Sequence, residues 1–422
     1  MTATSPISAG AAAPAQTEAE RLGLSFWEFV AIVAFAMSIT ALSVDIMLVA
    51  LPDIGTALSV VDDNDRQHIV LSYMLGFAAG HLIVGPASDR FGRKPVLLIG
   101  LAVYAVAAAA ATFAGDFTTM LVARVVQGLG GSAPRVVAVA VVRDRFEGRA
   151  MARVMSFVMM LFILVPVVAP SIGSLVLMVG SWRWIFAFLL VCAVALAIWI
   201  ARRLPETHPA APGGPGVLEA FSLIFRSRVT VGYTIAVGFI FGVILSYIAS
   251  AQQLFADVYG IVDAFPLYFA SVSLMMVVAA LSNANLVRTL GMRRLSHGAL
   301  IGLCATTLTA LVPQLVGVSI GLVAALATLS AIFFFIGLIL PNANALAMEP
   351  IGRVAGTGSS IIGFYMTGAG AALGGAVAQA FDGTLLPFSI GAAALSAAAL
   401  VTVVLTEPRL FMRPAPQRAG GN

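Results

Sequence analysis

Residues 67–94 read QHIVLSYMLGFAAGHLIVGPASDRFGRK, and this stretch indicates the fold class. Residues 67–87 contain no Asp, Glu, Lys or Arg. An apolar run of this length crosses the roughly 30 Å hydrocarbon core of a bilayer as an α-helix. The basic residues that follow are typical of the cytoplasmic end of a membrane helix. The stretch therefore predicts one membrane span and the loop that ends it.

The same pattern recurs along the chain from Trp27 to Leu405. Of the 422 residues, 60% are hydrophobic and only 10% are charged, whereas a soluble domain carries about 25% charged residues. No soluble fold could bury that much apolar surface, so we predict an all-α membrane protein. The twelve predicted spans are residues 27–51, 67–87, 95–114, 118–142, 153–178, 183–201, 230–254, 266–287, 296–313, 317–345, 357–381 and 386–405.

The distribution of basic residues predicts the orientation. Twelve spans place both termini on one side, and with that side inside, 19 of the 23 Lys and Arg residues fall in inner segments. Only Arg66 and Arg183 fall outside. Because cytoplasmic segments carry an excess of basic residues, we expect both termini to be cytoplasmic in a bacterial inner membrane.

One inner connection divides the chain. Residues 202–229 are rich in Pro and Gly and predict a flexible linker. It separates two predicted six-helix bundles, residues 27–201 and 230–405, which is the arrangement expected when two bundles rock about a central site. Residues 1–26 lack the apolar core of a signal peptide. We expect them, like residues 406–422, to form a cytoplasmic tail.

Other classes of function are not supported. Cys192 and Cys304 lie inside apolar runs and predict neither a disulfide nor a metal site. No His-Glu-x-x-His or Gly-x-Gly-Asp set occurs within a span, and no soluble domain is large enough for a sensor. We therefore expect no enzyme, cofactor, metal or nucleic acid. We expect a monomer whose partners are the bilayer, protons and a small-molecule substrate.

The loop after the second span, GPASDRFGRK at residues 85–94, resembles the signature loop of the major facilitator superfamily. An acid that pairs at a helix end and a basic cluster in the headgroup layer suit a gate at the inner surface. The alternative is a bare positive-inside anchor. The resemblance implies twelve helices in two six-helix bundles. The residues it assigns to the gate are Gly85, Asp89, Arg90, Gly92, Arg93 and Lys94.

Two further stretches resemble motifs of the same superfamily. RVVQGLGG at residues 124–131 is similar to the span 4 motif, in which an intramembrane arginine takes part in proton coupling. PVVAPSIGS at residues 166–174 is similar to the span 5 motif of antiporters. That motif is degenerate here, because Phe162 replaces its upstream glycine and Ser174 replaces its last one. We add Pro166, Pro170 and Gly173 to the conformational motif.

Finer features resemble the bicyclomycin/chloramphenicol-resistance branch of the drug:proton antiporters. They are VDIMLVALP at residues 44–52, VRDR at 142–145, WRWIF at 182–186 and VAGTGSS at 354–360. The resemblance covers residues 27–405. Two residues depart from it: Arg135 stands in place of a small or neutral residue, and His81 in place of a common glutamine.

Asp45 and Arg124 are charged residues inside predicted spans. Asp45 lies six residues before the predicted end of span 1, about 10 Å deep at ~1.5 Å per residue, and Arg124 lies at a similar depth. Either they pair or a hydrated cavity reaches both, and the alternative to a functional role is a structural ion pair. We assign proton coupling to Asp45 first, with Arg124 tuning it. His81 is a second relay candidate, although a packing role explains it equally well.

Other polar and aromatic residues within the spans suit substrate binding. Arg135 follows Arg124 by 11 residues and leaves the same helix face. It either attracts an anionic or zwitterionic substrate or extends to the inner surface. Aromatic residues of the second bundle suit an apolar cavity with few polar anchors, although each is individually more typical of packing. The predicted substrate-binding residues are Asp45, Arg124, Gln127, Arg135, Tyr247, Phe364, Tyr365 and Asn344.

The sequence thus predicts a secondary transporter that exports a small amphipathic compound in exchange for protons. Asp45 would alternate between protonated and substrate-engaged states, and Asp89 would latch the inner gate. The alternative is a proton-coupled exporter or importer of a specific metabolite. Pro341 beside Asn342 also suggests a broken helix in span 10.

Overall fold

The computed structural model describes residues 23–208 and 217–407. Within them, twelve helical segments are long and apolar enough to cross a membrane. The prediction of an all-α protein with twelve spans is therefore confirmed. We call residues 23–208 the first half and residues 217–407 the second half.

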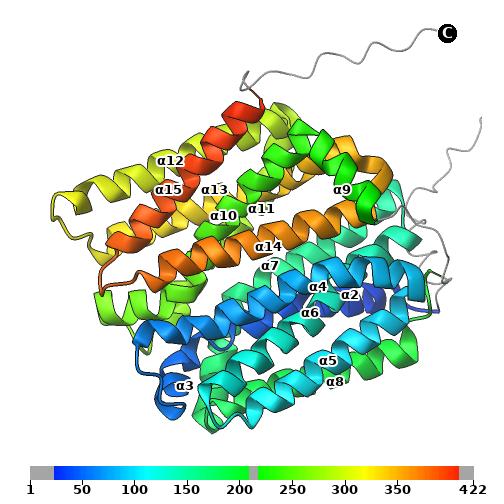
Figure 1. The fold of residues 1–422 in the computed structure, drawn as a ribbon, viewed down its shortest axis with the longest axis horizontal. Coiled ribbons are helices and arrows are strands. Elements are labelled where there is room, and N and C mark those ends of the chain that lie inside the picture. Colours follow the sequence, from blue (N-terminus) through cyan, green and yellow to red (C-terminus); the bar gives the residue numbers. More distant parts are fainter. Residues whose placement is uncertain (1–22, 209–216, 408–422) are drawn as a thin grey trace, which may run out of the picture.

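The first half forms one group of helices, coloured blue to green in Figure 1. Its elements are α2 (Phe26–Asp45), η1 (Leu48–Ala50), α3 (Leu51–Ala57), η2 (Asp63–Gln67), α4 (His68–Phe91), α5 (Arg93–Thr112), α6 (Phe117–Arg145), α7 (Gly148–Val179) and α8 (Arg183–Arg203). In its interior, α6 packs against α4 and α5. Gly128 of α6 makes the α4 contact possible, because a methyl group there would lie 2.0 Å from the Tyr73 carbonyl oxygen. Small residues at such contacts let membrane helices approach closely.

The second half lies above the first in the same view (Figure 1). Its elements are α9 (Val217–Arg226), α10 (Arg228–Gln253), η3 (Leu254–Val258), α11 (Phe265–Leu290), α12 (Met292–Leu315), α13 (Leu322–Met348), η4 (Glu349–Val354), α14 (Ala355–Gln379) and α15 (Leu386–Thr406). The halves meet where α14 packs on α4 and where α11 packs on α7. A site between the halves is therefore bounded by these four helices.

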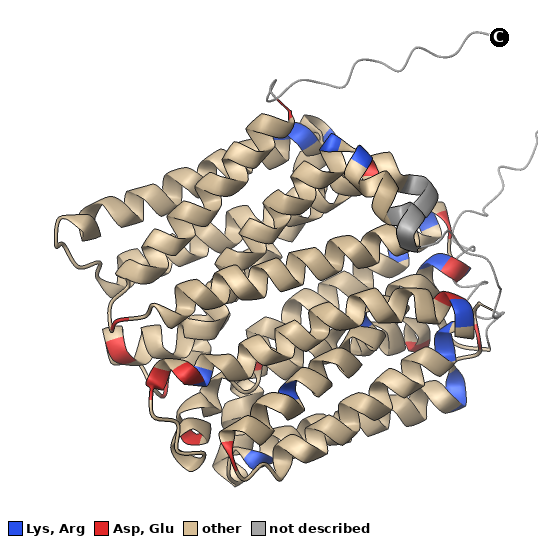
Figure 2. Ribbon diagram, in the orientation of Figure 1, with Lys and Arg blue, Asp and Glu red and all other residues tan. Residues whose placement is uncertain are grey.

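The two ends of the bundle differ in charge (Figure 2). We call the end that carries residues 89–94 the basic end and the end that carries η2 the acidic end. Asp116 caps the N-terminus of α6 at the acidic end, where its side chain accepts from the Thr119 amide at 2.8 Å and the Thr119 hydroxyl at 2.6 Å. These hydrogen bonds lower the pKa of Asp116. The separation of charge agrees with the orientation predicted from the sequence, and which end faces the cytoplasm stays a prediction.

Two local predictions are wrong. The tenth span begins at Leu322 and not at residue 317, because Gly317 adopts a φ of 80° and ends the preceding turn. The expected break at Pro341 is also absent, since α13 runs unbroken from Leu322 to Met348. A proline removes one backbone hydrogen bond. In the same turn the Asn342 side chain donates to the Leu338 carbonyl at 2.7 Å, which adds a local hydrogen bond.

The predicted flexible linker contains a helix that its composition did not suggest. Its Pro and Gly residues end at Gly216, and α9 occupies residues 217–226. This ten-residue stretch has no helix breaker and carries apolar residues at helical spacing, so it can pack one face. Ile224 is buried, whereas Phe225 is 70% exposed. Residues 209–216 lie outside the described part of the chain.

Candidate functional site

Asp45 is the last residue of α2, at a break in the first span. The chain leaves the α-helix after Asp45, and α3 begins at Leu51. Asp45 is 3% exposed, and no described residue forms a hydrogen bond or an ion pair with its carboxyl group. The break packs against α7, where a methyl group on Gly173 would lie 2.1 Å from the Ile46 carbonyl oxygen. Gly173 of the span 5 motif thus packs directly against the backbone that follows Asp45.

Tyr247 faces this region from the second half. Its hydroxyl group lies within electrostatic range of the Asp45 carboxyl group, is buried and has no hydrogen-bond partner among the described residues. The Tyr247 ring stacks on Phe269 at a centroid distance of 5.6 Å and meets Phe333 edge-on at 4.9 Å. Asp45 and Tyr247 therefore lie at the contact between the halves.

Arg124 does not pair with Asp45. Its guanidinium group donates to the Ile69 carbonyl at 3.1 Å, the Ser43 carbonyl at 3.2 Å and the Gln127 amide oxygen at 2.6 Å. It also lies 4.4 Å from the centre of the Tyr73 ring. Of the two arrangements expected from the sequence, the direct ion pair is absent from this structure. Arg124 instead joins α6 to α2 and α4 within the first half.

The signature loop forms an ion-pair network at the basic end. Arg93, which is 4% exposed, donates through Nη1 to Asp89 at 2.5 Å and to Ser88 at 2.7 Å, and through Nε to Asp144 at 2.8 Å. The network connects α4, α5 and α6. Arg90 is different, since its guanidinium group lies over the Phe91 ring, 5.3 Å from the centroid, and forms no ion pair with a described residue. Within this loop, Asp89 and Arg93 are therefore the paired residues.

Glu206, which the sequence analysis did not select, caps the N-terminus of α5. Its carboxylate accepts from the backbone amides of Arg93 at 2.9 Å and Lys94 at 3.1 Å. Carboxylates stabilise helix N-termini, where backbone N–H groups have no helical partner. Gly92 permits the approach, because its φ is 95° and a side chain there would collide with Glu206. Glu206 thus ties the segment after α8 to the signature loop.

The second half contains a related ion-pair network at the start of its third span. Arg293 at the start of α12 donates to Glu349 at 2.8 Å and to Glu407 at 2.9 Å. Glu349 follows the fourth span of its half, as Asp144 ends the fourth span of the other, and Glu407 and Glu206 each follow the sixth span. Asp89 has no acidic counterpart, because Arg288 holds its position in the second-half loop. Matching the ends of the sixth spans in the two halves would have selected Glu206 and Glu407.

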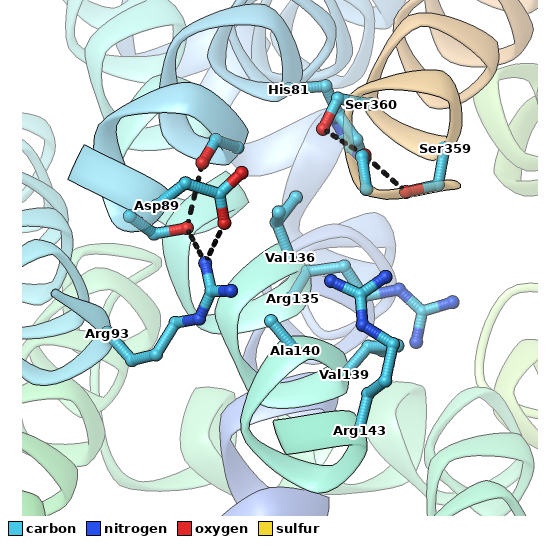
Figure 3. A pocket seen from close by; sticks show the side chains of 13 residues that line it. His81, Asp89, Arg93, Arg135, Val136, Val139, Ala140, Arg143, Ser359 and Ser360 are labelled. Carbon is cyan, nitrogen blue, oxygen red and sulfur yellow. Dashed lines mark hydrogen bonds and ion pairs between the residues drawn. The ribbon is translucent and has the colours of Figure 1, made fainter. Parts of the chain in front are cut away.

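A pocket of about 220 Å³ opens at the basic end between α4, α6 and α14 (Figure 3). Its lining residues are His81, Gly85, Ser88, Asp89, Arg93, Arg135, Val136, Val139, Ala140, Arg143, Gly356, Ser359 and Ser360. It brings three of the predicted gate residues, Gly85, Asp89 and Arg93, together with Arg135 and His81. His81 Nδ1 lies 2.9 Å from the Phe77 carbonyl oxygen, and its ring lies against Gly363 of α14.

At the acidic end, a cluster of four amide side chains joins the halves. The cluster is formed by Asn64, Gln67, Gln253 and Gln379, which we call the amide cluster. Gln67 Nε2 donates to Gln253 Oε1 at 2.6 Å, and Gln253 Nε2 donates to Asn64 Oδ1 at 2.9 Å. Asn64 Nδ2 donates to the carbonyls of Gln379 and Phe381 at 3.1 and 2.8 Å. Gln379 Nε2 donates back to the Asn64 carbonyl at 2.7 Å and to Gln67 Oε1 at 3.2 Å.

The remaining predicted substrate-binding residues lie elsewhere on the helices. Phe364 of α14 is 37% exposed. Tyr365 lies against α10, where a methyl group on Gly238 would lie 2.8 Å from its ring. Asn344 is half-buried on α13. Within the described chain, these three form no hydrogen bond or ion pair with Asp45 or Arg124, and their role in binding stays a prediction.

The described chain is a twelve-helix bundle with ion-pair networks at its basic end and one buried carboxyl group between its halves. These features define a multi-pass membrane transporter. Residues 33–375 match the Major Facilitator Superfamily, and the chain belongs to this family. It is therefore a secondary transporter and not an enzyme. Its partners are a small-molecule substrate and the bilayer.

Curated relatives extend over most of the chain. The bicyclomycin resistance protein homolog of Haemophilus influenzae is 31% identical over 371 residues, covering 83% of this chain and 89% of the relative. The MFS-type transporter YdgK of Bacillus subtilis is 30% identical over 358 residues, covering 82% and 86%. The multidrug resistance protein MdtL of Escherichia coli K12 is 31% identical over 221 residues, about half of each chain. The first relative confirms the resemblance to the bicyclomycin-resistance branch.

Solved structures share the fold. The human organic anion transporter MFSD10 has a TM-score of 0.66 at 18% identity, covering 90% of this chain and 99% of that one. The xylose transporter XylE of E. coli has a TM-score of 0.70 at 12% identity, covering 92% and 99%. These likenesses confirm the major facilitator fold.

Proposed function

We propose that the protein exports small amphipathic compounds, including drugs, across a bacterial inner membrane in exchange for protons. The observation that supports this most is Asp45, the one buried carboxyl group in the described chain, at a helix break between the halves. The names of the relatives, bicyclomycin resistance and multidrug resistance, support drug efflux. The basic residues at one end support cytoplasmic termini.

Asp45 suits proton coupling because of its surroundings. A charged carboxylate without a partner is costly to bury, whereas a protonated one is neutral. A carboxyl group that is buried in one conformation and hydrated in another binds its proton with different affinity in the two. Proton binding at Asp45 therefore shifts the balance between conformations, and this shift is what antiport requires.

The basic end supplies the second element of the cycle, the gate. Gly85 packs on Ser360 of α14, since a methyl group on Gly85 would lie 2.3 Å from the Ser360 hydroxyl oxygen. A methyl group on Gly356 would lie 4.0 Å from Asp89 Oδ2 and 3.5 Å from Arg143 Nη2. The α14 N-terminus, with its partial positive charge, thus lies beside the Asp89 carboxylate. We assign Asp89 to a latch that releases when α14 moves from α4.

Two experiments test the proposal. In the first, an efflux-deficient host expressing the wild type is compared with one expressing Asp45→Asn across a panel of antibiotic classes. We expect the wild type to raise the inhibitory concentration of at least one class and the variant to raise none. In the second, everted vesicles carry a proton gradient reported by a pH-sensitive dye. The compounds exported should dissipate the gradient with the wild type and leave it intact with Asp45→Asn. Continued pH-driven accumulation by Asp45→Asn would exclude the role assigned to Asp45.

A further inference from the structure

We infer that the pocket at the basic end binds the anionic group of the transported compound, a carboxylate or a phosphate, and that Arg135 is its main ligand. The inference rests on the proposed function, because it names the chemical class of the substrate that the transporter accepts. The charges that line the pocket are unbalanced. Three arginines line it against a single carboxylate, that of Asp89.

The pairing within the pocket leaves positive charge uncompensated. Arg93 is bonded to Asp89 and to Asp144, so neither carboxylate is free to neutralise a second guanidinium group. Arg135 and Arg143 form no ion pair with a described residue. In Figure 3 both guanidinium groups extend toward the side of the pocket formed by Ser359, away from the Asp89 and Arg93 pair. Two like charges on one small pocket repel each other, and a bound anion removes that repulsion.

Arg135 itself has an unused donor. Its Nη1 atom is buried and forms no hydrogen bond with any described residue. One face of the guanidinium group is held by the Phe162 ring, 4.4 Å from the centroid. Leaving a buried charged donor without an acceptor is costly. Arg135 is therefore fixed in position by Phe162 with a donor still available for a ligand.

The pocket also restricts what the rest of the ligand can be. The Ser359 and Ser360 hydroxyl groups both donate to the Gly356 carbonyl, at 2.8 and 3.4 Å. Their oxygens remain available as acceptors, so they suit a hydroxyl or amide N–H of the ligand. The volume of about 220 Å³ is below the roughly 300–1,000 Å³ of most sites for drug-sized ligands. The pocket thus fits an anionic group with a small body attached to it.

Three probes of similar size and different charge test the inference: benzoate, benzamide and benzylamine. Binding to the purified protein in phosphatidylcholine nanodiscs is measured by calorimetry. We expect benzoate to bind at least tenfold more tightly than benzamide, and benzylamine to bind more weakly than either. Arg135→Gln should reduce benzoate affinity at least tenfold, which is about 1.4 kcal/mol, and leave benzamide affinity unchanged. Arg135→Lys, which keeps the charge, should restore part of the preference.

The control is Arg149→Gln, because Arg149 is exposed at the same end of the bundle and does not line the pocket. It should bind benzoate like the wild type. Equal affinity for benzoate and benzamide in the wild type, or unchanged benzoate affinity in a monodisperse Arg135→Gln sample, would overturn the inference. Repeating the measurement with phosphatidylglycerol nanodiscs separates the two sources of an anion. If phosphatidylglycerol abolishes benzoate binding, the pocket binds a lipid headgroup, and the inference about substrate fails.

Failure of this inference and failure of the proposed function give different results. If the vesicles still show Asp45-dependent export but benzoate does not bind through Arg135, the proposed function stands and only the substrate class is wrong. If benzoate binds through Arg135 but no compound is exported in exchange for protons, the binding site stands and drug antiport is wrong.

Discussion

The amide cluster at the acidic end should decide how often this end opens. Gln253 shares two hydrogen bonds with Gln67 and Asn64 across the contact between the halves. Each such bond contributes about 0.5–1.5 kcal/mol net, and a buried donor left unpaired adds to the loss. Gln253→Ala should therefore destabilise the closed acidic end by about 1–3 kcal/mol, which shifts the equilibrium toward the open state roughly 5–150-fold.

Spin labels measure this shift directly. Val61 and Val262 are both exposed, belong to different halves and lie in connections at the acidic end, so cysteines there can be labelled once Cys192 and Cys304 are replaced by alanine. We expect Gln253→Ala to move population from the short to the long distance in pulsed electron spin resonance. Gln314→Ala is the matched control, since Gln314 bonds only within its own half, to Ala310 and Ser389. An unchanged distance distribution in Gln253→Ala would refute the assignment of the amide cluster as a latch.

Three further predictions follow from the basic end and the orientation. Asp89→Asn should slow substrate export several-fold without lowering substrate affinity, because it breaks the pair with Arg93 and removes a negative charge from the pocket at the basic end; equal losses in both, compared by equilibrium binding and vesicle export, would remove it from the gate. Glu206→Ala should destabilise the protein by about 0.5–2 kcal/mol, the usual value of a helix cap, and so lower the midpoint of thermal unfolding. The control is Glu147→Ala, because Glu147 stands at an N-cap but its side chain makes no capping hydrogen bond. In a fluorescence melt, Glu147→Ala should leave the midpoint unchanged. A cysteine at Arg149 should react with an impermeant maleimide only in everted vesicles and one at Val61 only in intact cells; the opposite pattern would reverse the predicted orientation.

The sequence predicted the spans well because membrane helices must be long, apolar and bounded by charge. It failed where one span contains more than one element. The first span was expected to be one helix through Leu51, but the α-helix ends at Asp45 and restarts at Leu51. The apolar run continues through residues 46–51, so hydropathy alone carries no signal for the break. Pro341 shows the opposite error, because a helix breaker in the sequence is accommodated within an unbroken helix.

The candidate site was predictable in its parts but not in its pairings. Motif resemblance selected Asp89 and Arg93, which are paired, whereas depth along the helix suggested either a pair between Asp45 and Arg124 or a cavity that reaches both, and the pair is absent. Depth fixes the position along a helix axis but not which neighbour a side chain meets. Arg124 finds backbone carbonyls within its own half, which no pattern of charged residues reveals. The amide cluster was missed for a related reason, since Asn and Gln near helix ends are common and only the tertiary contact between halves distinguishes these four.

The two ends of the bundle should respond differently to membrane voltage. The contacts across the acidic end involve amide groups, which carry no net charge. Breaking them moves no charge through the field, whereas moving one elementary charge across 100 mV involves about 2.3 kcal/mol. Breaking the amide cluster should therefore add no voltage dependence to the opening of the acidic end. Any voltage dependence of transport then belongs to the steps in which Asp45 exchanges its proton or the ion-pair network around Arg93 separates.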